Sequence, residues 1–153
     1  MPTFTTEAEI IKYAQSLIES SQKKKDSNVR KVVGEANSRA VEQEVYAKYH
    51  PNDYDRRGKD GGLADERNTE VTSVKSSGNT TQVLLENLTE GADSMKGRYI
   101  DDMIQIGTGG KWYNPNGAWA DARPYTESAI ANLQQGAELT EALKRDLRNI
   151  GLE

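Results

Sequence analysis

The first apolar pattern of the chain is a helical stripe near its beginning. Thr6 and Glu9 have the spacing of a capping box, in which each side chain satisfies a backbone N–H at the start of a helix. The residues that follow place apolar side chains on one face at a period of 3.6, namely Ile10, Ile11, Ala14, Leu17 and Ile18. The pattern predicts a helix that begins at residue 7 and fades near Ser20–Ser21.

A second helix is predicted over residues 28–49. Asp26 or Ser27 can cap its first turn, and its apolar positions run from Val29 to Tyr49. Small residues at Gly34, Ala36 and Ala40 allow close approach of another element. Pro51 ends the helix, because the residue before a proline is pushed out of the helical region.

A β-hairpin is predicted over residues 70–88. Segments 70–77 and 80–88 contain most of the valines and leucines of this region and flank Gly78–Asn79, a two-residue connection that suits a tight hairpin turn. Their alternation of apolar and polar residues is untidy. A short helix over residues 99–107 follows, with its apolar face formed by Tyr99, Ile100, Met103 and Ile104.

The C-terminal region predicts two helices within residues 126–150. Thr126 is an N-cap for the first, and Gly136 breaks it. The second carries an apolar stripe and ends at Gly151, which is a typical C′ residue; the stripe is Leu139, Leu143, Leu147 and Ile150. The chain thus predicts one α+β domain over residues 1–153, with helices at both ends around a small antiparallel sheet, a long polar loop at 50–69 and an aromatic loop at 107–125.

The amino-acid composition indicates that the hydrophobic core is small. Isoleucine, leucine, valine and phenylalanine make up 27 of 153 residues, about 18 %. The sequence has no cysteine, one histidine and a net charge of −4, so disulfides, thiolate sites and multi-histidine metal sites are excluded. It shows no secretory signal and no apolar span for a membrane. We expect a core that neighbouring subunits complete; a monomer with long polar loops is the alternative.

Loop 107–125 holds both tryptophans, Trp112 and Trp119, among glycines, prolines and asparagines. Such a run continues neither a helix nor a central strand. Because tryptophan is costly to leave in water, the loop must fold onto another surface. That surface is either the core of the domain or another protein.

An enzymatic function would have to use carboxylates. The acidic residues that could hold magnesium are Asp60, Asp65, Glu66, Asp101 and Asp102. A nuclease of the restriction type needs a carboxylate on the following strand, where this chain reads Ser73–Val74–Lys75. Cations near the aromatic residues suit a single-strand binding face, but interleaved aspartates cancel the local field. We therefore expect no enzyme activity and no cofactor.

Two segments resemble a known family. One reads Val45-Tyr46-x-x-Tyr49-x-Pro51-x-x-Tyr54-x-Arg56-Arg57, followed by Gly61-Gly62-Leu63. The other runs from Gly107 through Trp119 to Arg123-Pro124-Tyr125, where the family usually has Arg-Pro-Phe. In this order they resemble the neck and tail-completion (head–tail joining) proteins of long-tailed bacteriophages. The likeness spans roughly residues 45–125.

The resemblance implies a non-enzymatic virion protein that forms a ring, commonly hexameric, at the head–tail junction. Its implied partners are other copies of the chain, the head connector and a tail-tube or tail-terminator protein, and DNA passes the lumen without specific binding. It would assemble in the host cytoplasm. The residues expected at subunit or partner interfaces are Tyr49, Tyr54, Arg56, Arg57, Trp112, Trp119 and Arg123. A metal-dependent nucleic-acid-processing enzyme of phage origin and a monomeric host-interaction module are the alternatives.

Overall fold

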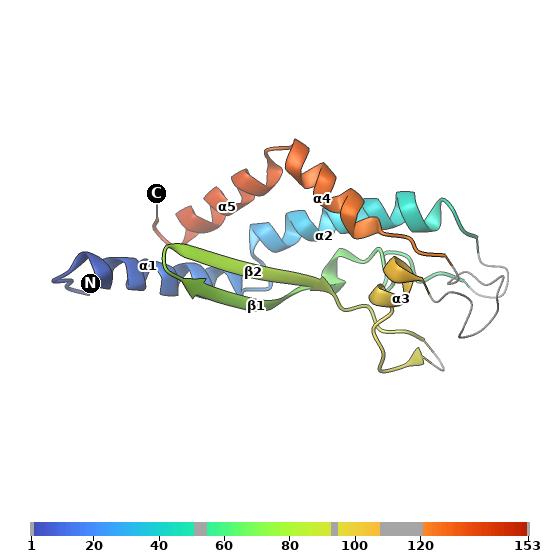
Figure 1. Ribbon diagram of the computed structural model, residues 1–153, viewed down its shortest axis with the longest axis horizontal. Coiled ribbons are helices and arrows are strands. Elements are labelled where there is room, and N and C mark those ends of the chain that lie inside the picture. The colour runs from blue at the N-terminus through green and yellow to red at the C-terminus, as the bar shows by residue number, and fades with distance from the viewer. Residues whose placement is uncertain (1, 51–54, 93–94, 108–120, 153) are drawn as a thin grey trace.

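The computed structural model describes residues 2–50, 55–92, 95–107 and 121–152. It confirms the predicted fold class, because helices at both ends flank one two-stranded antiparallel sheet (Figure 1). In chain order the elements are α1 (Glu7–Gln22), α2 (Asn28–Val41), the π-helical turn η1 (Glu42–Tyr46), the 3-10 turn η2 (Glu66–Asn68), β1 (Thr69–Ser77), β2 (Thr80–Asn87), α3 (Asp101–Ile106), α4 (Tyr125–Gln135) and α5 (Glu138–Asn149).

Helix α2 is the central element of the molecule. It contacts β1, η2, α4 and α5, so that the hairpin lies on one side of it and the two C-terminal helices on the other (Figure 1). The close approach predicted at Gly34 is present, since a Cβ atom there would lie 2.8 Å from the Glu66 carbonyl oxygen. Ala36 and Ala40 are fully buried and also keep the neighbouring backbone near.

The ends of the first two helices agree in part with the prediction. Thr6 and Glu9 form the capping box, and Ser27 caps α2 by accepting a hydrogen bond from the Arg30 N–H at 3.2 Å. The regular helix α2 ends at Val41, however, and a π-helical turn carries the chain to Tyr46. The helix predicted to reach residue 49 is therefore shorter than the sequence pattern indicated.

The hairpin forms as predicted around Gly78, which has a φ of 57°. A β-bulge between Val71 and Ser73 explains the untidy alternation, because one extra residue shifts the pleat. As a result Val71 pairs with Leu85 and Val74 pairs with Val83. These four apolar side chains come to lie on one face although the spacing along β1 is three.

Two details of the predicted apolar faces are wrong. Tyr99 bridges to Glu90 ahead of α3 and is exposed, whereas Ile100, Met103 and Ile104 do pack on the core. Leu143 of α5 is 41 % exposed, and the fully buried positions of that helix are Ala142 and Asp146.

The start of α4 also differs, because the helix begins at Tyr125 after Pro124 and no side chain caps it. Thr126 therefore lies inside the first turn. Among the described residues Tyr125 has the largest fully buried side chain, and it joins the core cluster beside Ala129 and Leu63. Within the described residues no helix is long and apolar enough to cross a membrane.

The carboxylate of Asp146 joins three helices. It is buried, at 2 % exposure, and accepts hydrogen bonds from the backbone N–H of Asn28 at 2.8 Å and of Val29 at 3.1 Å, and from the Asn28 side chain at 2.7 Å. Gln22, the last residue of α1, donates to it at 3.3 Å. Helix α5 thus caps the N-terminus of α2, where a negative charge also opposes the helix dipole.

We predict that Asp146→Ala lowers the free energy of unfolding by about 2 kcal/mol or more, because several buried donors lose their acceptor. Urea denaturation followed by circular dichroism measures this loss. Glu141→Ala on the same helix is the matched control, since Glu141 pairs with Lys144 in solvent and its loss should cost at most about 1 kcal/mol. Equal effects of the two substitutions would contradict the prediction.

Candidate functional site

Three of the seven predicted interface residues meet beyond α2, at the end of the π-helical turn η1. Tyr49 lies just after the π-helical turn, Arg56 follows it in the chain, and Arg123 comes from the segment before α4. Tyr54, Trp112 and Trp119 lie outside the described residues, so their interface role stays a prediction.

The cluster is held by cation–π contacts. The guanidinium carbon of Arg56 lies 4.5 Å from the centre of the Tyr46 ring and 5.5 Å from that of Tyr49. The guanidinium carbon of Arg123 lies 5.1 Å from the Tyr49 ring centre. Two arginines that are far apart in the sequence therefore share one tyrosine, at distances typical of cation–π attraction. We call Tyr46, Tyr49, Arg56 and Arg123 the tyrosine–arginine cluster.

Arg56 also completes the end of the helix. Its Nη1 donates a hydrogen bond to the carbonyl oxygen of Tyr46 at 3.0 Å, and that carbonyl belongs to the last turn, where acceptors lack a helical partner. A cation at a helix C-terminus is further favoured by the dipole. The Nη2 atom of Arg56 is buried and has no hydrogen-bond partner among the described residues.

The π-helical turn places Tyr46 in this cluster. Its widened hydrogen bond runs from the Ala47 N–H to the Glu42 carbonyl oxygen at 2.9 Å, and such a turn inserts one extra residue. The Tyr46 hydroxyl accepts a bond from the Ala64 N–H at 3.3 Å, and burial raises the pKa of Tyr46. Tyr46 was part of the signature but was missed as a site residue; its spacing of three from Tyr49 was the available signal.

Arg57 differs from its neighbour. It is exposed and donates a hydrogen bond to the Glu90 carbonyl oxygen, which ties the loop to the segment after β2. The glycines that follow keep this loop tight, because a Cβ atom on Gly62 would lie 2.5 Å from the Gly58 carbonyl oxygen. The turn delivers Leu63 into the core at 3 % exposure. The Gly-Gly-Leu part of the signature is therefore structural.

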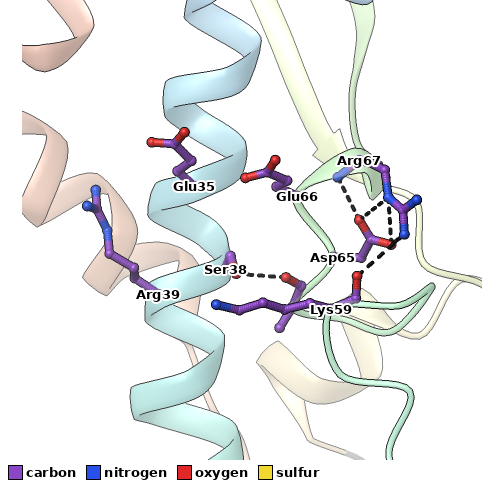
Figure 2. Close-up of a pocket in the computed structure, with 8 residues that line it drawn as sticks. Glu35, Ser38, Arg39, Lys59, Asp65, Glu66 and Arg67 are labelled. Atoms are coloured by element: carbon purple, nitrogen blue, oxygen red, sulfur yellow. Dashed lines mark hydrogen bonds and ion pairs between the residues drawn. The ribbon is translucent and has the colours of Figure 1, made fainter.

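A cleft of about 440 Å³ lies between α2 and the segment that leads into β1 (Figure 2). Glu35, Ser38 and Arg39 line it from α2, and Lys59 with residues 64–67 faces them. The Ser38 hydroxyl donates to the Ala64 carbonyl oxygen at 2.7 Å and fixes the two walls together. Cations and carboxylates alternate around the cleft, so its field has no dominant sign.

Among the carboxylates that line this cleft, Asp65 has the most strongly shifted pKa. Arg67 donates to it from Nε at 2.8 Å and from Nη2 at 2.6 Å (Figure 2). The backbone N–H of Gly61 also donates to it, at 2.7 Å. The hydrogen bonds from Arg67, opposed by burial, lower the pKa of Asp65 from 3.8 to about 2. Both carboxylate oxygens of Asp65 accept hydrogen bonds, so this residue stabilises the loop and has no free oxygen to bind a metal ion.

Asp101 likewise accepts hydrogen bonds that hold the fold together. It accepts a hydrogen bond from the Tyr125 hydroxyl and one from the Gln105 side chain at 2.8 Å, while burial raises its pKa. Tyr125, which replaces the usual phenylalanine of the signature, thus donates a hydrogen bond from its hydroxyl to the half-buried carboxylate of Asp101. In the described part of the chain no three histidine, cysteine or acidic residues are grouped as metal ligands.

Stability should depend on pH through Asp65. A lowered folded-state pKa means that its contribution is complete above pH 3.8 and is lost as the pH falls through about 2. We predict that Asp65→Asn lowers the free energy of unfolding at neutral pH by about 1–2 kcal/mol, a figure reduced because Arg67 is largely exposed. The variant should also lose less stability than the wild type between pH 4 and 2.

Chemical denaturation across this pH range checks the prediction. Asp60→Asn is the matched control, because Asp60 also approaches Arg67, at 3.4 Å, but its side chain is fully exposed. If Asp65→Asn kept the pH profile of the wild type, the ion pair would not stabilise the fold.

Comparison with known proteins places the chain in a family. The family model described as YomN matches residues 8–149. The SPbeta prophage-derived uncharacterized protein YomN of Bacillus subtilis (strain 168) is 27 % identical over 151 residues, which cover 95 % of this chain and 98 % of the relative. No solved structure matches the chain. Because the family model covers most of the chain and its relative is encoded by a prophage, the protein belongs to the YomN family and is phage-derived.

Proposed function

We propose that the protein is a structural virion component of a tailed phage that forms a ring, hexameric by family likeness, at the head–tail junction. Its membership of a family with a prophage-derived member supports the phage setting. The observation that carries the proposal is the tyrosine–arginine cluster. It brings the two signature segments of the neck-protein resemblance together in space, with Arg56 and Arg123 on the same tyrosine ring.

The chemistry of the described residues supports a structural role. Asp65 and Asp101, two of the carboxylates considered for magnesium, are engaged by Arg67 and Tyr125 in bonds that hold the fold. Tyrosine and arginine are the residue types that most often dominate protein interfaces. Several large apolar side chains are exposed as well, which is typical of a subunit whose surface meets other proteins; they include Ile10, Leu84, Ile106 and Ile130.

Three measurements test this proposal. The mass of the purified protein under native conditions should correspond to a closed oligomer, and a phage that lacks the gene should accumulate separate heads and tails. Incubation with DNA and Mg²⁺ should leave the DNA intact. Cleavage that disappears in Asp65→Ala would support the alternative, a metal-dependent nucleic-acid-processing enzyme, and a monomer with normal virion assembly would support a host-interaction module.

The arginine pair gives a sharper prediction for the interface. Arg56 is used within its own subunit, so Arg56→Ala should lower folding stability as well as assembly. Arg57 is exposed and makes a hydrogen bond within its own subunit, to the Glu90 carbonyl oxygen. Arg57→Ala should therefore cost the subunit little stability, leave it folded and weaken assembly by about 2–5 kcal/mol per joint if Arg57 meets a carboxylate of a neighbour.

Complementation of a phage defective in this gene, together with sedimentation of the purified variants, measures the effect. Lys59→Ala is the control, because Lys59 is an exposed cation two residues away that pairs with Glu42 at 3.0 Å. It should change assembly by at most about 1 kcal/mol. Wild-type assembly of Arg57→Ala would remove Arg57 from the interface.

A further inference from the structure

The first half of α1 projects from the molecule with its apolar face uncovered. The side chain of Gln15 donates a hydrogen bond to the carbonyl oxygen of Gly78 at the turn of the hairpin, so the hairpin ends level with the middle of the helix. Residues before Gln15 extend beyond both the hairpin and α5 (Figure 1). We call residues 4–14 the α1 arm.

Exposure changes along a single stripe of this helix. Towards its end, Leu17 and Ile18 are half-buried, and Ser21 and Gln22 are buried. On the arm the same stripe continues with Ile10 at 52 % and Ile11 at 36 % exposure, and Tyr13 beside it is 39 % exposed. The sequence therefore builds a continuous apolar face, of which the other described residues cover only one half.

The arm is a well-formed helix although nothing within the described residues covers this face. The capping box is extended by Thr5, whose backbone N–H and hydroxyl both donate to the Glu9 carboxylate, at 2.7 and 2.9 Å. Phe4 turns back onto Tyr13, with 5.1 Å between the ring centres. An ordered helix with an open apolar face needs little reorganisation before it binds a partner.

A groove that could accept the α1 arm lies near the C-terminus of the chain. Lys144, Leu147, Arg148 and Leu152 line a groove of about 430 Å³ at the C-terminal end of α5. The Leu152 N–H donates to the Leu147 carbonyl oxygen at 2.9 Å, which folds Leu152 back over the last turn. The groove is therefore lined by two leucines and two cations.

We propose that the α1 arm of one copy of this chain packs into the α5 groove of a second copy. The apolar side chains of the arm match the leucines of the groove, and the charges are complementary. The first turn of α1 carries Glu7 and Glu9, whereas the last turns of α5 carry Arg145 and Arg148. Lys144 also lies there but pairs with Glu141 of its own helix. Acidic and basic surfaces of this kind select one orientation of docking.

A second copy is the occupant because the arm cannot reach the groove of its own chain. Helix α1 has 16 residues, and its end at Gln22 is held by Asp146 of α5. The arm consequently points away past the end of α5 (Figure 1). Arm and groove are different surfaces, so the contact can be repeated from one copy to the next, as a closed ring requires. The inference rests on the proposed self-assembly and names the surfaces that produce it.

Cross-linking tests the contact directly. The chain contains no cysteine, so each engineered cysteine is unique. One batch of protein carries Ile10→Cys and a second carries Leu147→Cys; after mixing and subunit exchange, a short bis-maleimide should link them into a heterodimer. Lys12→Cys replaces Ile10→Cys in the control, since Lys12 lies on the opposite face of the same helix. A yield at least several-fold higher with Ile10→Cys supports the contact, and equal yields overturn it.

Charge substitutions give an independent measurement. Ile10→Glu should raise the dissociation constant of the assembly at least tenfold, whereas Lys12→Glu should leave it unchanged. Both positions are exposed, so circular dichroism and the melting temperature should match those of the wild type. Glu7→Lys should also weaken assembly, and Arg148→Glu in the same chain should restore it.

The outcomes separate this inference from the proposed function. If the wild type assembles and Ile10→Glu assembles equally well, the arm is not the contact, and the proposed ring is unaffected. If the wild type remains a monomer under native mass measurement at every concentration and is absent from the neck of the virion, both the ring and the arm contact are overturned.

Discussion

A buried carboxylate at the N-terminus of α2 is the constraint on which this structure depends. Asp146 replaces the water that would otherwise satisfy the first backbone N–H groups of the central helix, and it also receives the end of α1 through Gln22. One side chain thereby sets the position of both terminal helices relative to α2. Because the hairpin and α4 pack along the same helix, their positions follow from it.

The polar composition of the chain is reflected in its interior, which contains small and polar side chains. Small side chains such as Ala36 and Ala40 bring elements close together, and the largest buried group, Tyr125, has a hydroxyl that must find a partner. Asp101 provides it. Acidic residues that look like metal ligands in the sequence therefore act as acceptors for the fold.

The molecule carries two different surfaces at its opposite ends (Figure 1). At one end, Arg56 and Arg123 hold Tyr49 where the two signature segments meet. At the other, the α1 arm exposes Ile10 beyond the rest of the chain. A subunit with separate contact surfaces can bind copies of itself through one and different neighbours through the other, as the proposed position between a phage head and its tail requires.

Local chemistry in the sequence determined the capping box at Thr6, the cap at Ser27 and the hairpin turn at Gly78, because each depends on residues only a few positions apart. The sequence also singled out Tyr49, Arg56 and Arg123, which the structure brings into contact, while their role at an interface stays a prediction. Only the tertiary structure decided that Asp146 is buried and Leu143 exposed, since the choice of covered face depends on which helix lies opposite. Likewise, the meeting of Arg56 and Arg123 on one ring follows from packing between distant segments, which periodicity along the chain does not encode.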